Sequence, residues 1–282
     1  MPLTDRDDLP RFDAVRLGAL LASMHAAADL ARSVTVPRFR VPPHAPLSID
    51  DKASGQGFDP VTDADREAEA LVREHLLDAH PEIGFLGEES ASHGATSGPR
   101  WVVDPIDGTR AFITGMPLWG TLIALNDGQD VVLGLLDQPI LGERYVGGAD
   151  GAFLHAAGSV RPLRTRRDRA LADASLCCTT PDMFAPGAER AAFDRVAMRA
   201  KLVRYGGDCY AYAQLAAGYV DLVIESDLKP WDVQALIPIV RGAGGTVTDW
   251  SGNGAGEGGC IVAAGSADLH AEALSHLRDA PR

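Results

Sequence analysis

The segment WVVDPIDGTRAF, residues 101–112, joins a short apolar run to two aspartates. Its first three residues, Trp101–Val103, are apolar and are typical of a buried strand. Asp104 and Asp107 follow, although a carboxylate is costly to bury unless it is paired. Two aspartates spaced D-x-x-D at a strand end can point to the same spot, but the proline and glycine beside them also suit a surface turn. The segment by itself leaves both interpretations open.

Three further segments place acidic residues beside apolar elements. They are DPVTDAD (59–65) around the start of a predicted helix, GEES (87–90) after a short strand, and KPWDVQALIPIV (229–240), an apolar helix headed by one aspartate. Each has a simpler explanation, because acids near a helix N-terminus interact favourably with the helix dipole and Glu89 is expected to be a solvated neighbour. Together they favour a Mg²⁺ site, because Mg²⁺ takes oxygen ligands and two such ions can hold a phosphoryl group between them.

Zinc or iron chemistry is disfavoured, because the eight histidines form no H-E-x-x-H motif and no cysteine pair has C-x-x-C spacing. Gly108 and Thr109 add groups that phosphate chemistry uses. A glycine lets backbone N–H groups approach a phosphate closely. A threonine hydroxyl beside a carboxylate can help to orient and deprotonate an attacking water.

In order and spacing, the four segments resemble the inositol monophosphatase family of Mg²⁺-dependent, lithium-sensitive phosphatases, over roughly residues 10–275. The resemblance implies an α/β (α+β) fold, a layered αβαβα sandwich of the inositol monophosphatase and fructose-1,6-bisphosphatase type, usually assembled as a homodimer. It also implies two to three Mg²⁺ ions and direct attack by water on the phosphate ester, without a phosphoenzyme.

The metal ligands follow from the same resemblance. Glu88, Asp104 and the backbone carbonyl of Ile106 would bind the first ion, and Asp104, Asp107 and Asp232 the second. Glu88 would also help to hold a third, weaker ion. The second ion would stabilise the leaving alkoxide.

The resemblance assigns the other site positions as well. Asp65 would hydrogen-bond Thr109, and Thr109 with Glu88 would activate the attacking water. The amides of Gly108 and Thr109 would hold the phosphate. Lys52 matches a family lysine in a loop near the metals and is a possible contact, although the glycine-rich stretch after it is longer than in the inositol enzymes.

Two segments near the leaving group, YGGDCYAY (205–212) and DLVIESDLKPWD (221–232), look most like the histidinol-phosphatase branch of the family. Histidinol phosphate carries an ammonium group that inositol phosphate lacks, and Glu225 with Asp208 or Asp227 would supply the opposite charge. Asp208 is also suited to cap a helix, and Asp227 is expected to be a solvated loop acid. The predicted function is hydrolysis of L-histidinol phosphate, a step of histidine biosynthesis.

Two alternatives stay open. An inositol-1-monophosphatase, or a broad sugar or nucleotide monophosphatase, would use the same metal site, although no extra basic or aromatic nucleotide pocket is evident. A non-catalytic RNA-polymerase or ribosomal-RNA assembly partner belongs to a different class of protein. The formal net charge of −13 and the complete set of metal ligands disfavour it.

The length of 282 residues suits one large domain or two tightly joined parts. An α+β part with an antiparallel sheet is predicted over residues 1–160 and an α/β part over 161–282, forming one compact unit with the active-site cleft between them. An irregular segment is predicted over 37–60. Helices are predicted over 12–32, 62–80, 188–200, 208–218, 232–243 and 267–279.

Charge and hydropathy bear on partners and location. A net charge of −13 should repel nucleic acid and anionic membranes. No apolar stretch is long enough for a membrane span, and MPLTDRDDLPRF has no signal-like pattern. A cytoplasmic enzyme with a small phosphate ester as its partner is therefore predicted. Cys177, Cys178 and Cys260 are expected to be reduced core residues.

Overall fold

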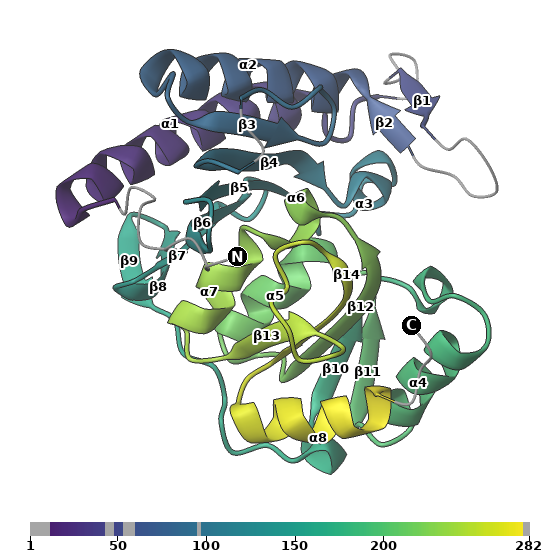
Figure 1. Ribbon diagram of the computed structural model, residues 1–282. Coiled ribbons are helices and arrows are strands. Elements are labelled where there is room, and N and C mark those ends of the chain that lie inside the picture. The colour runs from purple at the N-terminus through teal and green to yellow at the C-terminus, as the bar shows by residue number, and fades with distance from the viewer. Residues whose placement is uncertain (1–11, 43–47, 53–59, 95–96, 279–282) are drawn as a thin grey trace, which may run out of the picture.

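The computed structural model describes residues 12–42, 48–52, 60–94 and 97–278, which form five alternating layers (Figure 1). Helices α1 (Ala14–Arg38) and α2 (Asp63–Ala79) cover one face of a seven-stranded sheet. Between it and a five-stranded sheet lie α5 (Asp208–Ala216), α6 (Pro230–Val233) and α7 (Leu236–Gly242). The far side is covered by α4 (Ala188–Ala197) and α8 (Ala267–Leu277). The predicted αβαβα sandwich is confirmed.

The outer helix pair forms where capping residues and apolar periodicity agree. Asp13 caps α1 by accepting a hydrogen bond from the Arg16 amide, and Thr62 and Asp65 form a capping box at the start of α2. Apolar side chains of both helices pack with Trp101 of the sheet in one core cluster. The helices are thus held by burial on one face and by caps at their N-termini.

The segment predicted to be irregular contains regular structure. Helix α1 continues to Arg38, and β1 (Ile49–Asp51) pairs antiparallel with β2 (Pro60–Thr62). Three-residue strands are too short to show an alternating pattern, so periodicity cannot reveal them. Asp59 of the DPVTDAD segment lies outside the described residues.

The seven-stranded sheet carries the DPIDGT segment at the end of its second strand. Its order is β3 (Gly84–Gly87), β4 (Arg100–Asp107), β5 (Gly120–Asn126), β6 (Val131–Gln138), β7 (Glu143–Gly148), β8 (Gly151–Ala156) and β9 (Ser159–Pro162). β3 is parallel to β4, and each later pair is antiparallel. The pairing of β4 with β5 shifts register between Asp104 and Asp107, so the chain leaves the regular ladder where the two acids stand.

The five-stranded sheet is mixed. Its order is β11 (Leu202–Tyr205), β10 (Ser175–Cys178), β12 (Leu222–Leu228), β14 (Gly259–Ala264) and β13 (Thr246–Asp249). β10 runs parallel to both of its neighbours, and β14 runs antiparallel to both of its own. The four cysteines of the chain are all free: Cys177, Cys178 and Cys209 are buried, and Cys260 is partly buried.

The single helix predicted over 232–243 is in fact two helices, because α6 ends at Val233 and α7 begins at Leu236. Pro238 accounts for the interruption. It has no N–H to bond the Gln234 carbonyl, and its ring clashes with a carbonyl in that position. The break leaves α6 as a single turn with Asp232 at its third residue.

Helix α7 lies directly on the first sheet because two strand residues there have no side chain. A Cβ on Gly134 of β6 would lie 2.0 Å from the carbonyl oxygen of Ala235, and one on Gly147 of β7 would lie 2.3 Å from the amide nitrogen of Ile239. This close approach fixes the turn that precedes α7 against the first sheet. It therefore places Asp232 beside the end of β4.

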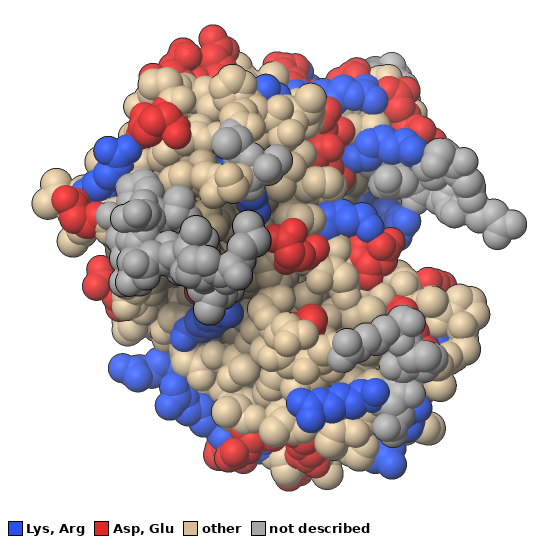
Figure 2. Space-filling view, viewed as in Figure 1, with Lys and Arg blue, Asp and Glu red and all other residues tan. Residues whose placement is uncertain are grey.

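The strands of the first sheet come from residues 84–162 and those of the second from 175–264. The predicted division between residues 160 and 161 falls within β9, the last strand of the first sheet, and the two-part division stays a prediction. In the described part of the chain, no helix is both long and apolar enough to cross a membrane. On the face shown in Figure 2, Lys and Arg side chains are scattered among Asp and Glu and do not gather into one basic band.

Candidate active site

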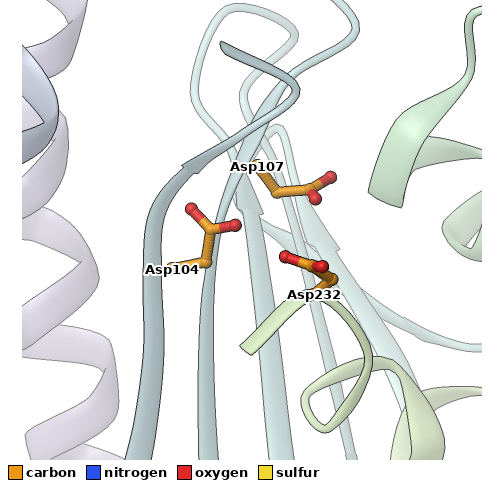
Figure 3. Close-up of side chains that lie close together, drawn as sticks. All are labelled: Asp104, Asp107 and Asp232. Carbon is orange, nitrogen blue, oxygen red and sulfur yellow. The ribbon is translucent and has the colours of Figure 1, made fainter. Parts of the chain in front are cut away.

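Three aspartates meet at the end of β4, with their carboxylates facing a common space (Figure 3). Asp104 and Asp107 come from β4 and Asp232 comes from α6, and one carboxylate oxygen of each lies within 4.8 Å of the others. Asp104 is buried, whereas Asp107 and Asp232 are partly exposed. The structure thus brings together the three residues predicted to bind one ion, and their role as ligands remains a proposal.

Backbone amides hold the three carboxylates in place. Asp104 accepts from the Ile106 amide at 2.9 Å, and Asp232 accepts from the Lys229 amide at 2.7 Å. Asp107 accepts from the Cys209 amide at 2.7 Å, in the first turn of α5. Because each acid keeps at least one oxygen beyond these bonds, the cluster retains acceptors for a ligand.

Burial and repulsion between the three carboxylates favour the binding of a cation to this cluster. Burial raises the pKa of Asp104 well above its usual range, and the negative charges of Glu88 and Asp107 raise it further. Burial and the charge of Asp208 do the same for the pKa of Asp107, and burial raises the pKa of Asp232 to about 7. Carboxylates crowded in this way take up protons or a positive ion. Their hard oxygen donors fit Mg²⁺.

Glu88 and Glu89 stand beside this cluster and share an ammonium group. The Nζ of Lys52 lies 2.7 Å from Oε1 of Glu88 and 2.8 Å from Oε1 of Glu89. The Glu89 side chain is only 5% exposed, so the expectation of a solvated neighbour is wrong: its charge is matched by Lys52 instead of by water. Lys52 is therefore placed next to the predicted ligand Glu88.

Thr109 lies within reach of Asp65, the partner that the family resemblance implies for it. Its hydroxyl donates to the Ile106 carbonyl at 3.1 Å and lies 3.4 Å from Oδ1 of Asp65. The other oxygen of Asp65 accepts from the Thr62 amide at 2.9 Å, which completes the cap of α2. Burial raises the pKa of Asp65 to about 6, against the opposing effect of the bonds from Thr62. Asp65 thus both caps a helix and reaches Thr109.

Gly108 and Asp208 lie against each other. Gly108 has a φ of 87° and precedes α3 (Thr109–Ile113), and a Cβ on it would lie 3.3 Å from Cβ and Cγ of Asp208. Asp208 itself has a φ of 43°, a left-handed conformation in which Asp is tolerated. No donor from the described residues hydrogen-bonds its carboxylate. Burial raises the pKa of Asp208 to about 6, although the positive charge of Arg110 lowers it.

Glu225 is enclosed rather than open. Its side chain is 2% exposed, and it accepts from the amide and hydroxyl of Thr179 and from the Tyr212 hydroxyl at 3.0 Å. Burial raises its pKa to about 7, and the charge of Asp208 contributes to the increase. The alternative residue Asp227 has a side chain that is 81% exposed and pairs with Lys229. Of the predicted substrate acids, Asp208 is therefore the one beside the aspartate cluster whose carboxylate accepts no hydrogen bond from the described residues.

Some residues that support the site lie outside the four acidic segments of the sequence. The Cys209 amide, Thr179 and Tyr212 support acids that the sequence predicts, yet each contact joins distant segments. Glu69 is a further buried acid, at 1% exposure, on the apolar face of α2. An acid among the buried positions of an amphipathic helix was the one signal for it in the sequence.

Comparisons with known proteins agree with this geometry. A sequence model of the inositol monophosphatase family matches residues 22–282. The chain is 41% identical over 281 residues to the bifunctional phosphatase IMPL2, chloroplastic, of Arabidopsis thaliana, covering 96% of the chain and 76% of that protein. It is 36% identical to a histidinol-phosphatase of Streptomyces coelicolor over 90% of the chain and 94% of the relative. A solved structure of an inositol monophosphatase from Zymomonas mobilis superposes with a TM-score of 0.81 at 39% identity, covering 95% of the chain and all of that structure.

Proposed function

The chain belongs to the inositol monophosphatase family, and on this premise we propose that it hydrolyses L-histidinol phosphate to L-histidinol and phosphate. The phosphatase class and the general dependence of the family on metals follow from membership. Sequence identity does not choose the substrate, because the histidinol-phosphatase and the inositol monophosphatase are 36% and 39% identical to the chain. The choice rests on the site itself.

The observation that carries the proposal is the unused carboxylate of Asp208. It lies beside Gly108, at the edge of the proposed phosphate site, with no hydrogen bond from the described residues. The positive charge of Arg110 acts on this carboxylate, yet its oxygens keep acceptor sites for a further donating or charged partner. Histidinol phosphate brings an ammonium group, whereas inositol phosphate brings hydroxyl groups alone. Burial and the charge of Asp208 raise the pKa of the enclosed acid Glu225, so a cation beside Asp208 would relieve repulsion between the two acids.

The proposed metal ligands are Asp104, Asp107, Asp232 and Glu88, with the carbonyl of Ile106. A bound Mg²⁺ would supply Lewis acidity to the phosphate oxygens and to the attacking water. The chain contributes the arrangement of the acids, which backbone amides fix before any ligand arrives. Such preorganisation avoids rearrangement during the reaction.

Other groups of the chain would handle the phosphate and the proton. The amides of Gly108 and Thr109 would receive phosphate oxygens, because Gly108 has no side chain to obstruct them. The Thr109 hydroxyl already donates its proton to Ile106 or Asp65, so its lone pairs remain free to accept from a water. That water's oxygen would attack phosphorus while the ester P–O bond breaks. Asp65, with a pKa of about 6, would be a suitable acceptor for the proton.

Phosphate release from L-histidinol phosphate and from myo-inositol 1-phosphate, measured side by side with Mg²⁺, tests the proposal. We expect kcat/KM to favour histidinol phosphate by about 100-fold, or roughly 2.7 kcal/mol. No preference, or the reverse one, would leave the phosphatase class intact and support inositol phosphate as the substrate.

A substitution locates the source of the preference. Asp208→Asn keeps the shape and the left-handed backbone but removes the charge. It should lower kcat/KM for histidinol phosphate by about tenfold, with little change for inositol 1-phosphate. Asp227→Asn, in an exposed acid of the same region, is the matched control and should change neither. Equal losses on both substrates would show that Asp208 does not recognise an ammonium group.

A further inference from the structure

We infer that Glu69, a buried acid beneath the GEES loop, is a positioning residue that fixes Glu88 and so sets the cation affinity of the site. The inference rests on the proposed role of Glu88 as a metal ligand. Glu69 does not face the three aspartates, and it would act through the loop it holds.

Helix α2 presents two buried acids one turn apart, and each reaches a different part of the site. Asp65 approaches Thr109. Glu69 reaches the loop after β3, where its Oε2 accepts from the Glu89 amide at 2.8 Å. Burial raises the pKa of Glu69, and the hydrogen bonds that it accepts from the Glu89 amide and from Ser90 oppose that increase.

These bonds fix the backbone on both sides of Glu88. The Glu88 amide donates to the Val103 carbonyl at 3.3 Å, which is a long bond, and the next amide donates to Glu69 at 2.8 Å. The shorter of these two bonds is thus the one that Glu69 accepts. Without the bond to Glu69, the long bond to Val103 of β4 would be left to hold the backbone at Glu88.

Gly87 shows how tightly the acid is fitted. A Cβ on Gly87 would lie 2.5 Å from the carboxyl carbon and from both oxygens of Glu69. The carboxylate therefore lies directly against the Gly87 backbone, in space that any other residue would fill. This contact explains why residue 87 is a glycine. The backbone conformation does not, because the φ of Gly87 lies outside the left-handed region.

The arrangement is not the one that stability alone favours. Oε1 of Glu69 is buried and has no hydrogen-bond partner among the described residues. Leaving a buried polar atom unpaired costs free energy. An apolar residue would avoid that cost, so an acid at this position points to a role in the loop that carries Glu88.

The test is Mn²⁺ binding, as a probe for the site, measured by electron paramagnetic resonance on the full chain without substrate. Glu69→Gln keeps the volume but places an NH₂ donor where the loop offers donors. We expect its Mn²⁺ affinity to fall about tenfold, the usual effect of altering a group that orients a ligand. Glu67→Gln, in a half-exposed acid of the same helix that pairs with Arg38, is the matched control and should bind like the wild type.

Two more variants separate positioning from simple structural damage. Glu69→Asp keeps the charge but is one methylene shorter, so its affinity should lie between those of the wild type and Glu69→Gln. Gly87→Ala should weaken Mn²⁺ binding by displacing the acid from the other side. In all three, turnover should recover at high Mg²⁺ with KM for the phosphate ester unchanged.

Wild-type affinity in both Glu69→Gln and Glu69→Asp would overturn the inference, as would a loss of turnover that high Mg²⁺ does not restore. Should Glu69→Gln fail to fold, unchanged affinity in Glu69→Asp or in Gly87→Ala would overturn it equally. Failure of the proposed function gives a different result. If the wild type and Asp104→Asn bind Mn²⁺ alike, the metal site itself is misassigned, whatever Glu69 does.

Discussion

Asp104 is buried and faces the charges of Glu88, Asp107 and Asp232, and these effects together raise its pKa well above the usual range. Asp104→Asn should reduce turnover by at least about 100-fold, since it removes a charge shared by both proposed ions. The metal-free variant should be no less stable than the wild type, because the substitution also relieves repulsion. Turnover and thermal unfolding in a chelator check both expectations. Near-normal turnover would contradict the two-ion assignment.

Glu225 gives a pH dependence with a definite sign. Its pKa rises from 4.5 to about 7 on folding, so between these values the folded protein keeps a proton that the unfolded chain releases. Stability from this group is therefore full below pH 4.5 and is lost as pH rises through 7. At 1.36 kcal/mol per pKa unit, the change is about 3 kcal/mol.

Urea unfolding of metal-free protein at several pH values measures this effect. The wild type should lose stability from pH 4.5 to 7, and Glu225→Gln should lose less, because it has no proton to release. Asp208 and Asp232 act in the same direction and will leave a residual slope in the variant. A wild type that is equally stable across this range would show that Glu225 is ionised in the folded state.

Asp104, Asp107 and Asp232 can be predicted as site residues from the sequence, because each lies in a short segment with a recognisable pattern. The supports of those residues cannot, because the Cys209 amide reaches Asp107 only after α5 has folded against β4. The resemblance places Lys52 near the metals, but its pairing with Glu88 and Glu89 in the loop after β3 is visible only in the structure. A local pattern therefore predicts the acids, and tertiary packing decides which groups support them.

At the scale of elements, α7 packs so closely on the first sheet that Gly134 and Gly147 leave no space for a side chain. Gly134→Ala would place a methyl group 2.0 Å from the Ala235 carbonyl, so the helix must move away from β6. We expect a loss of about 1–3 kcal/mol or more in the free energy of unfolding and weaker metal binding, because Asp232 moves with the helix. Urea unfolding and Mn²⁺ binding measure the two effects.

Gly18→Ala is the matched control for that substitution. A Cβ on Gly18 meets nothing within 4 Å, and the residue lies inside α1. Alanine in a helix is favoured over glycine by about 1 kcal/mol, so this variant should gain stability. A Gly134→Ala protein as stable as the wild type would mean that α7 is not held by close contact with β6.

The elements also show what a pattern can and cannot predict. The helices at 62–80, 188–200 and 267–279 are found with small changes at their ends, because each shows apolar periodicity. The break between α6 and α7 was signalled by Pro238, yet the apolar run around it masks the interruption. Strand β1 has three exposed residues and pairs with β2, so no burial pattern marks it.

At the scale of the whole molecule, the cluster joins the two sheets. Asp104 and Asp107 end a strand of the first sheet, and Asp232 belongs to the turn that follows β12 of the second. A cation bound there would link both parts and offset repulsion within a chain of net charge −13. The homodimer, the lithium sensitivity and the cellular location stay predictions from the resemblance and the composition.

Metal removal should therefore destabilise the whole molecule and not just its site. Mg²⁺ at 100 times its dissociation constant should raise the free energy of unfolding by about 2.7 kcal/mol, by mass action on the folded state. The gain should grow as pH rises toward 8, because the acids then hold fewer protons for the ion to displace. Asp232→Asn should lose most of it, and the exposed Asp227→Asn should keep it all. A Mg²⁺ effect that is the same in Asp232→Asn as in the wild type would mean that the ion bridges nothing between the sheets.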